Sequence, residues 1–224
     1  MNEKKMAIIS LVALAISLVF LTYFIIISVN LNHIVMESNL NIYSKASLFD
    51  SKFHDLTQEH TFLLITTVTR SLNSSTSFNA SYNALQINLK EISAQIANIY
   101  GTDYANQYLT IQSNKINYFI NYTIGVKNND PNANSVFSTN IAQYEDDISN
   151  FWSNKSTIVA DLDKSIIKKI VITAINDEKS AIDYWYQGDY VNYFSKLHDS
   201  YKDMGVYADT VMNAIIKQYP EKFQ

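Results

Sequence analysis

The stretch from residue 190 to residue 219, YVNYFSKLHDSYKDMGVYADTVMNAIIKQY, decides the fold class. Its apolar and aromatic side chains recur at steps of three or four residues: Tyr190, Phe194, Leu197, Tyr201, Met204, Ala208, Met212, Ile215 and Tyr219. This spacing is that of the a and d positions on one face of an α-helix. The charged residues of the stretch fall mainly beside or opposite that face. We therefore predict a long terminal helix that packs an aromatic stripe into a helical bundle.

The rest of the sequence also predicts long helices. Its 224 residues include only four glycines and two prolines, so few tight turns are available. Polar clusters and isolated breaks divide it into helices predicted at about 31–72, 82–98, 103–125, 135–153, 157–186 and from 190 onward. We group these into an antiparallel bundle of four to five long helices, which makes the predicted fold class all-α.

The segment before the bundle has the character of a membrane anchor. Residues 6–29, MAIISLVALAISLVFLTYFIIISV, contain no formal charge, and about 20 apolar residues cross a bilayer core. A cleaved signal peptide is the competing interpretation. Its apolar region is shorter, about 7 to 15 residues, and the sequence NLNHIVME that follows offers no small-x-small cleavage site. The sequence therefore favours an uncleaved N-terminal transmembrane helix.

The charges that flank this segment predict its orientation. Lys4 and Lys5 precede it, and the next basic residue is Lys45, so the positive-inside rule places the N-terminus in the cytosol and the bulk of the chain outside it. The expected parts are a cytosolic tail, a transmembrane helix, a juxtamembrane helical stalk and a bundle domain: 1–5, 6–29, 30–54 and 55–220. A lipid bilayer is thus one expected partner, and a virion or host membrane fits as well as a cell surface.

Composition excludes several classes of function. The chain contains no cysteine, which rules out disulfides and thiolate chemistry. Beyond residue 30, 20 acidic residues face 15 basic ones, and Arg70 is the single arginine, so nucleic acid is not expected as a partner. Motifs for phosphate loops, nucleophile elbows, zinc proteases and EF-hands are missing from the sequence. These absences favour binding or scaffolding with a protein partner over catalysis, and no cofactor is expected.

A metal site is the alternative that would make the protein an enzyme. Glu59 and His60 adjoin in one predicted helix and Asp203 lies in another, and Asp146 or Asp147 lies in a third. If the bundle brings them to one level, their carboxylates and imidazole would suit a metal-dependent hydrolase. The competing interpretation is that each is an ordinary exposed or capping residue.

The aromatic run before the last helix offers a ligand-pocket hypothesis. Trp185, Tyr190 and Tyr193 are candidates to line an amphipathic cavity, which would make the bundle a ligand sensor. Core packing is the commoner role of such stripes, and we favour it here.

Four N-x-S/T sequons are candidate glycosylation sites: Asn73, Asn79, Asn121 and Asn154. Asn73, Asn79 and Asn154 fall in predicted loops, whereas Asn121 falls within a predicted helix, where a glycan is harder to accept.

Five short segments carry a resemblance to other proteins: YGTDYANQY (100–108), DDISNFW (146–152), GDY (188–190), YAD (207–209) and NAIIKQYP (213–220). With them, residues 55–220 resemble an uncharacterised family of small bacterial helical-bundle proteins, to which this chain adds an N-terminal membrane anchor. Some relatives bear an automatic kinase label, which nothing in this sequence supports. The resemblance implies a helical bundle and no particular activity.

Relatives in that family carry an early Glu-His pair and further histidines on later helices. Glu59 and His60 match the pair, whereas the later positions hold Lys115, Ala174 and Asp203. The resemblance therefore implies that most of any shared histidine site is lost in this chain.

Overall fold

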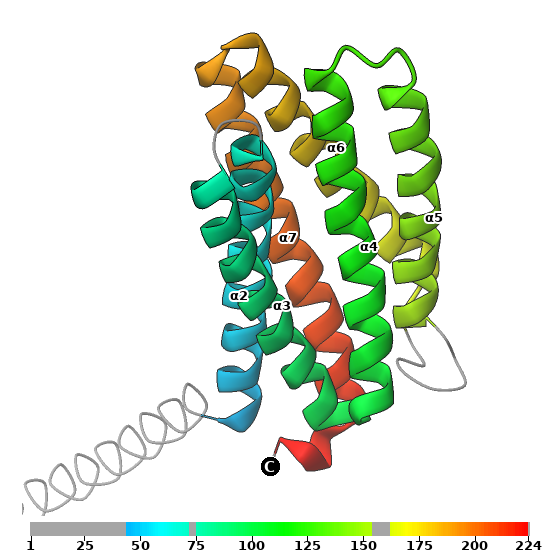
Figure 1. The fold of residues 1–224 in the computed structure, drawn as a ribbon. Helices are drawn as coiled ribbons and strands as arrows, with labels where there is room; N and C mark the ends of the chain where they lie inside the picture. Colours follow the sequence, from blue (N-terminus) through cyan, green and yellow to red (C-terminus); the bar gives the residue numbers. More distant parts are fainter. Residues whose placement is uncertain (1–43, 72–74, 154–161, 224) are drawn as a thin grey trace, which may run out of the picture. The chain divides into compact units, whose positions relative to one another are not determined.

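The structure is a computed structural model that describes residues 44–71, 75–153 and 162–223 (Figure 1). These residues form six α-helices and one short 3₁₀ helix: α2 (Lys45–Arg70), α3 (Ser75–Tyr100), α4 (Thr102–Lys127), α5 (Ala133–Ser153), α6 (Lys164–Gln187), α7 (Tyr190–Gln218) and η1 (Pro220–Lys222). The described residues from Leu48 onward make up one compact unit. The prediction of an all-helical bundle is confirmed for the described part of the chain.

The predicted fold class as a whole needs correction. It combined an N-terminal transmembrane helix with four to five bundle helices, whereas the described residues form six α-helices. Among the helices of the described residues, none combines the length and the apolar character that crossing a membrane requires. The segment 6–29, for which the membrane helix was predicted, lies outside the described residues. The helix predicted at 82–98 is a full-length element, α3 (Ser75–Tyr100), so each of the six predicted ranges corresponds to a helix of its own.

Local sequence explains where helices α6 and α7 begin and end. Asp163 caps α6, since its side chain accepts a hydrogen bond from the Ser165 backbone N–H at 2.7 Å. Gly188 ends α6 with φ of 72°, a left-handed conformation that glycine adopts without strain. The Asp189 carboxylate then caps α7 by accepting from the Asn192 N–H at 3.2 Å. Two residues therefore suffice to reverse the chain.

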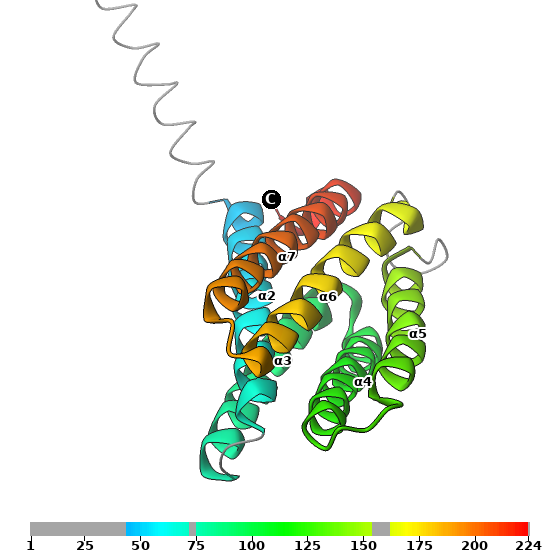
Figure 2. The same cartoon turned by 90° about the horizontal axis from the view of Figure 1, so that it is seen from above.

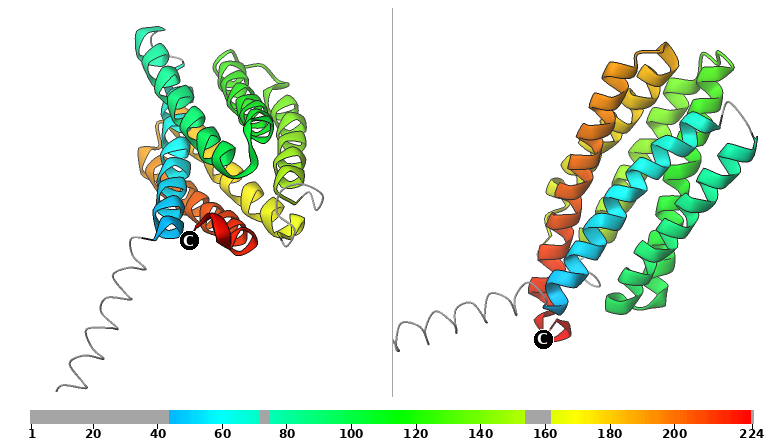
Figure 3. Two further views of the ribbon diagram at one scale, coloured as in Figure 1. Left: turned by 90° about the horizontal axis from the view of Figure 1, so that it is seen from below. Right: turned by 90° about the vertical axis from the view of Figure 1, so that its left-hand side faces the viewer.

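The helices pack in chain order and the last one returns to the first. Close packing joins α3 to α4, α4 to α5, α5 to α6 and α6 to α7, and Figure 2 shows this arrangement from above. Helix α7 lies beside α2 (Figure 3), where the Gln58 side chain donates to the Tyr201 carbonyl at 3.2 Å. Helix α2 also contacts α3 through His60 and Asn88. All six helices thus surround one interior.

Aromatic side chains close one end of the bundle. The rings of Phe49 and Phe223 lie 5.3 Å apart, and those of Tyr100 and Tyr219 lie 5.6 Å apart in an edge-to-face arrangement. The Lys222 ammonium group donates to the Ile99 carbonyl at 2.7 Å. These contacts hold the chain's last turn against the start of α2 and the end of α3.

The predicted stripe on α7 is correct in its second half, whereas in its first half Leu197 alone is partly buried. Met204, Ala208, Met212 and Ile215 are buried as expected. However, Tyr190, Phe194 and Tyr201 keep 54%, 62% and 41% of their surfaces exposed. The inward face of the first half instead carries Tyr193 and Ser200. Packing of Tyr193 against Trp185, at 5.1 Å between ring centroids, turns the helix so that the predicted aromatics face outward.

Candidate functional site

The Glu59–His60 pair divides between the surface and the interior. Glu59 is exposed and His60 is buried. Asn88 on α3 joins them: its amide nitrogen donates to Glu59 Oε2 and to the Leu56 carbonyl, both at 2.9 Å. Its side-chain oxygen lies 3.0 Å from His60 Nδ1. Because that oxygen can only accept, Nδ1 carries the imidazole hydrogen, and Nε2 is an acceptor that finds no partner among the described residues.

Asp203 does not join this pair. It lies on α7 beside Asp177 of α6, and burial together with the Asp177 charge raises the pKa of its carboxyl group above the ordinary value. Asp146 accepts from Lys168 at 2.7 Å, and Asp147 accepts from Gln143 at 2.8 Å. Across the ranges that the structure describes, no three histidine or carboxylate side chains meet in a geometry suited to a metal ion. The structure therefore does not assemble the trio Glu59, His60 and Asp203.

An ion pair that sequence reasoning missed occupies the interior. Lys115 Nζ on α4 lies 2.8 Å from Glu178 Oε1 on α6, and these side chains are 2% and 0% exposed. The Thr61 hydroxyl donates to the same oxygen at 3.4 Å. Lys115 Nζ also lies 5.8 Å from the Phe119 ring and 5.7 Å from the Tyr144 ring, within cation–π range. Neither charged group reaches the surface, so the pair belongs to the interior of the bundle.

Burial and the Lys115 charge together set the protonation of His60. Both disfavour imidazolium and lower the pKa of His60 from 6.5 to about 3, although the hydrogen bond with Asn88 opposes them. The same burial raises the pKa of Glu178, and the Lys115 ammonium works against that rise. At neutral pH, therefore, the His60 imidazole is uncharged.

We expect the free energy of unfolding to fall as the pH drops below 6.5. The His60 imidazole then binds a proton in the unfolded chain but stays neutral in the folded protein, because its folded-state pKa is about 3. Between about pH 7 and about pH 5 this effect amounts to about 2 kcal/mol. Urea unfolding at both pH values measures it. In the His60→Gln variant, the decrease in unfolding free energy between the two pH values should be smaller by that amount. An equal decrease in the variant and the wild-type protein would contradict a buried, neutral imidazole.

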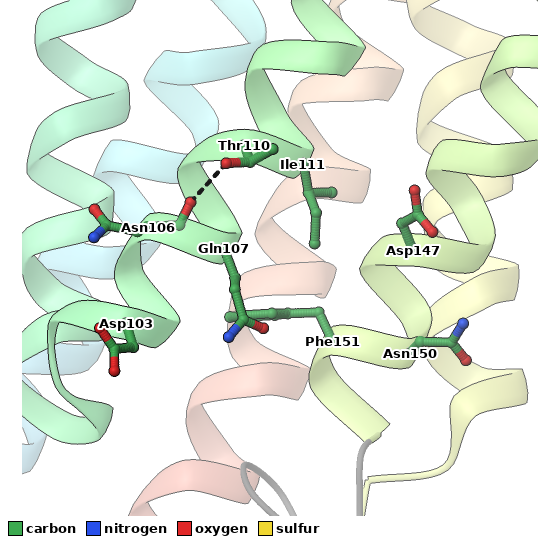
Figure 4. Close-up of a pocket in the computed structure, with 8 residues that line it drawn as sticks. All are labelled: Asp103, Asn106, Gln107, Thr110, Ile111, Asp147, Asn150 and Phe151. Atoms are coloured by element: carbon green, nitrogen blue, oxygen red, sulfur yellow. Dashed lines mark hydrogen bonds between the residues drawn. The ribbon is translucent and has the colours of Figure 1, made fainter.

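A surface groove lies between α4 and α5 (Figure 4). Its volume is about 550 Å³. The side chains that line it come from the first turns of α4 and the last turns of α5: Asp103, Asn106, Gln107, Thr110, Ile111, Asp147, Asn150 and Phe151. Figure 4 shows the Phe151 ring reaching from α5 toward α4, so that the groove has an apolar floor. Carboxylates and amides form its walls.

The groove is acidic and carries amide groups able to donate or accept hydrogen bonds. Among the described residues that line it, the charged ones are Asp103 on the α4 side and Asp147 on the α5 side, and none of these residues is basic. The Thr110 hydroxyl is already used, since it donates to the Asn106 carbonyl at 2.9 Å. Sequence reasoning missed the amides of this groove, because exposed Asn and Gln are spread through the whole chain and give no local signal.

The aromatic candidates at the α6–α7 turn contact one another. Trp185 lies 5.3 Å from Tyr190 and 5.1 Å from Tyr193 between ring centroids, and Phe194 lies 4.9 Å from Tyr193. Tyr193 is buried and Trp185 is half-buried, in a small cluster with Ile65 of α2. Whether this cluster admits a ligand stays a prediction.

The sequons differ in their surroundings. Asn79 lies in α3, not in the predicted loop, because that helix begins at Ser75. Asn121 lies in α4 as expected, and both asparagines are exposed. Asn73 and Asn154 lie outside the described residues. Glycosylation of any of the four stays a prediction.

Comparison with known proteins gave no relative. The chain matches no family model, no curated protein and no solved structure. The resemblance to small bacterial helical-bundle proteins accordingly stays a prediction from five short segments.

Proposed function

We propose that the bundle is a binding module whose α4/α5 groove holds a ligand with a positively charged alkylammonium group. The observation that carries the proposal is the placement of Asp103 on the α4 side and Asp147 on the α5 side of a groove whose described lining residues include no basic side chain. A cation in the groove is attracted by the carboxylate on each side. The apolar floor formed by Phe151 and Ile111 suits the carbon chain next to the charge.

Binding accounts for the groove better than catalysis does. The described residues that line it include no histidine, lysine, serine or cysteine, so this part of the lining lacks the commonest general base and the lysine, serine and cysteine nucleophiles. Asp147 accepts a hydrogen bond from Gln143, which supports its position from outside the groove. Amides such as Gln107 and Asn150 can donate to or accept from the polar parts of an extended ligand.

Two sources offer an alkylammonium group, a free polyamine and a lysine side chain of a protein partner. The second source corresponds to the scaffolding role expected from the sequence. Isothermal titration with spermidine and with a short lysine–glycine peptide distinguishes them. Tighter binding of spermidine indicates a polyamine ligand, and tighter binding of the peptide indicates a protein partner.

We expect Asp103→Asn and Asp147→Asn each to weaken binding of the tighter of these two probes about ten-fold. Each substitution removes one of the carboxylates that attract the cation. Glu91→Gln on α3 is the matched control, since it removes the same charge from an exposed position outside the groove. Equal affinities for both groove variants and the control would refute the proposal. The affinity should also fall with added salt.

A further inference from the structure

A second pocket, of about 400 Å³, opens between α2 and α7. Asp55, Glu59 and Phe62 line it from α2, and Tyr201 lines it from α7. Phe62 and Tyr201 are 50% and 41% exposed. We propose that this pocket receives an arginine or lysine side chain of a protein partner, and that the partner segment is amphipathic. The proposal concerns a surface other than the α4/α5 groove and does not depend on it.

The charge of the pocket is unbalanced. Asp55 and Glu59 lie one helical turn apart on α2, where like charges repel each other. Neither forms an ion pair with a cation of the described residues, and the polar contact of Glu59 is with the Asn88 amide. A cationic side chain placed between the two carboxylates would remove this repulsion and gain attraction to both.

Aromatic rings beside the carboxylates select the kind of cation. A guanidinium or ammonium group attracts the face of a nearby phenyl or phenol ring, and arginine does so most often. Phe62 and Tyr201 expose such rings next to Asp55 and Glu59 in one pocket. This combination distinguishes the site from a simple acidic surface and from the α4/α5 groove, whose one ring, Phe151, is buried at the floor.

Neighbouring contacts fix both walls in advance. Asn88 donates to Glu59 while its other hydrogen bonds, to the Leu56 carbonyl and with His60, hold it in place. On the other wall, Gln58 donates to the Tyr201 carbonyl. A Cβ at Gly205 would lie only 2.7 Å from Gln58 Nε2, so glycine there allows α2 and α7 to approach closely. A ligand therefore meets a pocket that is largely preformed.

The adjoining surface favours a protein segment over a small molecule. On α7, Tyr201, Phe194 and Tyr190 are spaced by seven and four residues, so they lie along one helix face, and all three are exposed. Val191 beside them is 82% exposed. Helices α2 and α7 run side by side in Figure 3. An amphipathic segment could place a basic residue in the pocket and its apolar residues on this aromatic face.

Fluorescence anisotropy with the full chain tests the proposal. The probe is a short fluorescein-labelled amphipathic helix with leucine on one face and arginine on the other, and a second peptide carries glutamine in place of arginine. We expect the arginine peptide to bind at least about ten-fold more tightly. The double variant Asp55→Asn and Glu59→Gln should remove that preference, and Phe62→Leu should reduce it, because leucine keeps apolar surface but has no ring.

Two further measurements separate the possible outcomes. Glu91→Gln removes an exposed carboxylate of α3 that lines neither pocket, so it should leave the arginine preference unchanged, and a loss in the Asp55/Glu59 variant then reports on this pocket. Arginine ethyl ester should compete only weakly with the peptide. The inference is overturned if the two peptides bind equally, if the Asp55/Glu59 variant keeps the preference, or if the free ester competes as well as the peptide does.

Discussion

Replacing Lys115 with methionine should lower the free energy of unfolding by about 3 to 5 kcal/mol. Methionine matches the length of the lysine stem but leaves the Glu178 carboxylate buried, 0% exposed, without its 2.8 Å partner. The Thr61 hydroxyl, at 3.4 Å, is the one neutral donor that remains on that carboxylate. An isolated buried charge carries a large desolvation cost, so the bundle is expected to unfold at a much lower urea concentration.

A double-mutant cycle separates the pair from the positions that it occupies. Glu178→Leu leaves Lys115 without a partner and should also destabilise strongly. The double variant with Lys115→Met should recover most of the loss, since an apolar pair of similar volume is often as stable as a buried ion pair. Additive losses in the double variant would contradict a direct interaction between these two side chains.

Trp152→Ala should destabilise the protein by about 3 to 5 kcal/mol as well, for an apolar reason. Trp152 is fully buried and has the largest side chain in the core. Its ring lies 6.0 Å from that of Tyr108 and 6.4 Å from that of Phe53, while its indole N–H donates to the Tyr207 hydroxyl. Alanine leaves a cavity among these rings and removes the donor. Thermal unfolding monitored by circular dichroism gives the size of the loss.

Phe194→Ala is the matched control for this prediction. Sequence periodicity placed Phe194 on the buried stripe of α7, but 62% of its surface is exposed. Its removal should change stability by no more than about 0.5 kcal/mol. A loss as large as that of Trp152→Ala would show that the helix is rotated toward the register expected from the sequence.

The sequence was sufficient for the class of fold because scarce glycine and proline leave long helical segments. It was insufficient for the rotation of α7. Both the stripe through Phe194 and the face that carries Tyr193 have helical spacing, and only packing against Trp185 on α6 selects between them. Periodicity identifies a helix more securely than it identifies which of two apolar faces is covered.

Part of the polar interior could have been anticipated. Lys115 falls at an inward position between Gln112 and Phe119, and Glu178 falls between Ile175 and Ile182 on the inner face of α6. A charged residue on an apolar face is a signal of a buried partner. Helix order alone does not say that these two meet across the bundle, because that depends on how far each helix is shifted along its axis.

The α2/α7 pocket lay beyond sequence reasoning for a similar reason. The sequence identified Glu59 as a candidate metal ligand, because His60 follows it and the two residues match an early Glu-His pair. The ring of Tyr201 was assigned to the core, so its place beside Glu59 could not be foreseen. Because the rotation of α7 was predicted wrongly, its exposed aromatic residues were assigned to the core.

The two-residue connection at Gly188 and Asp189 bears on the order in which the bundle assembles. Closing so short a loop costs little chain entropy, and α6 and α7 then pack extensively against each other. Contacts between near neighbours in the chain form faster than distant ones. This hairpin should therefore acquire protection from hydrogen exchange early in refolding, before α2, whose contacts with α7 span well over a hundred residues.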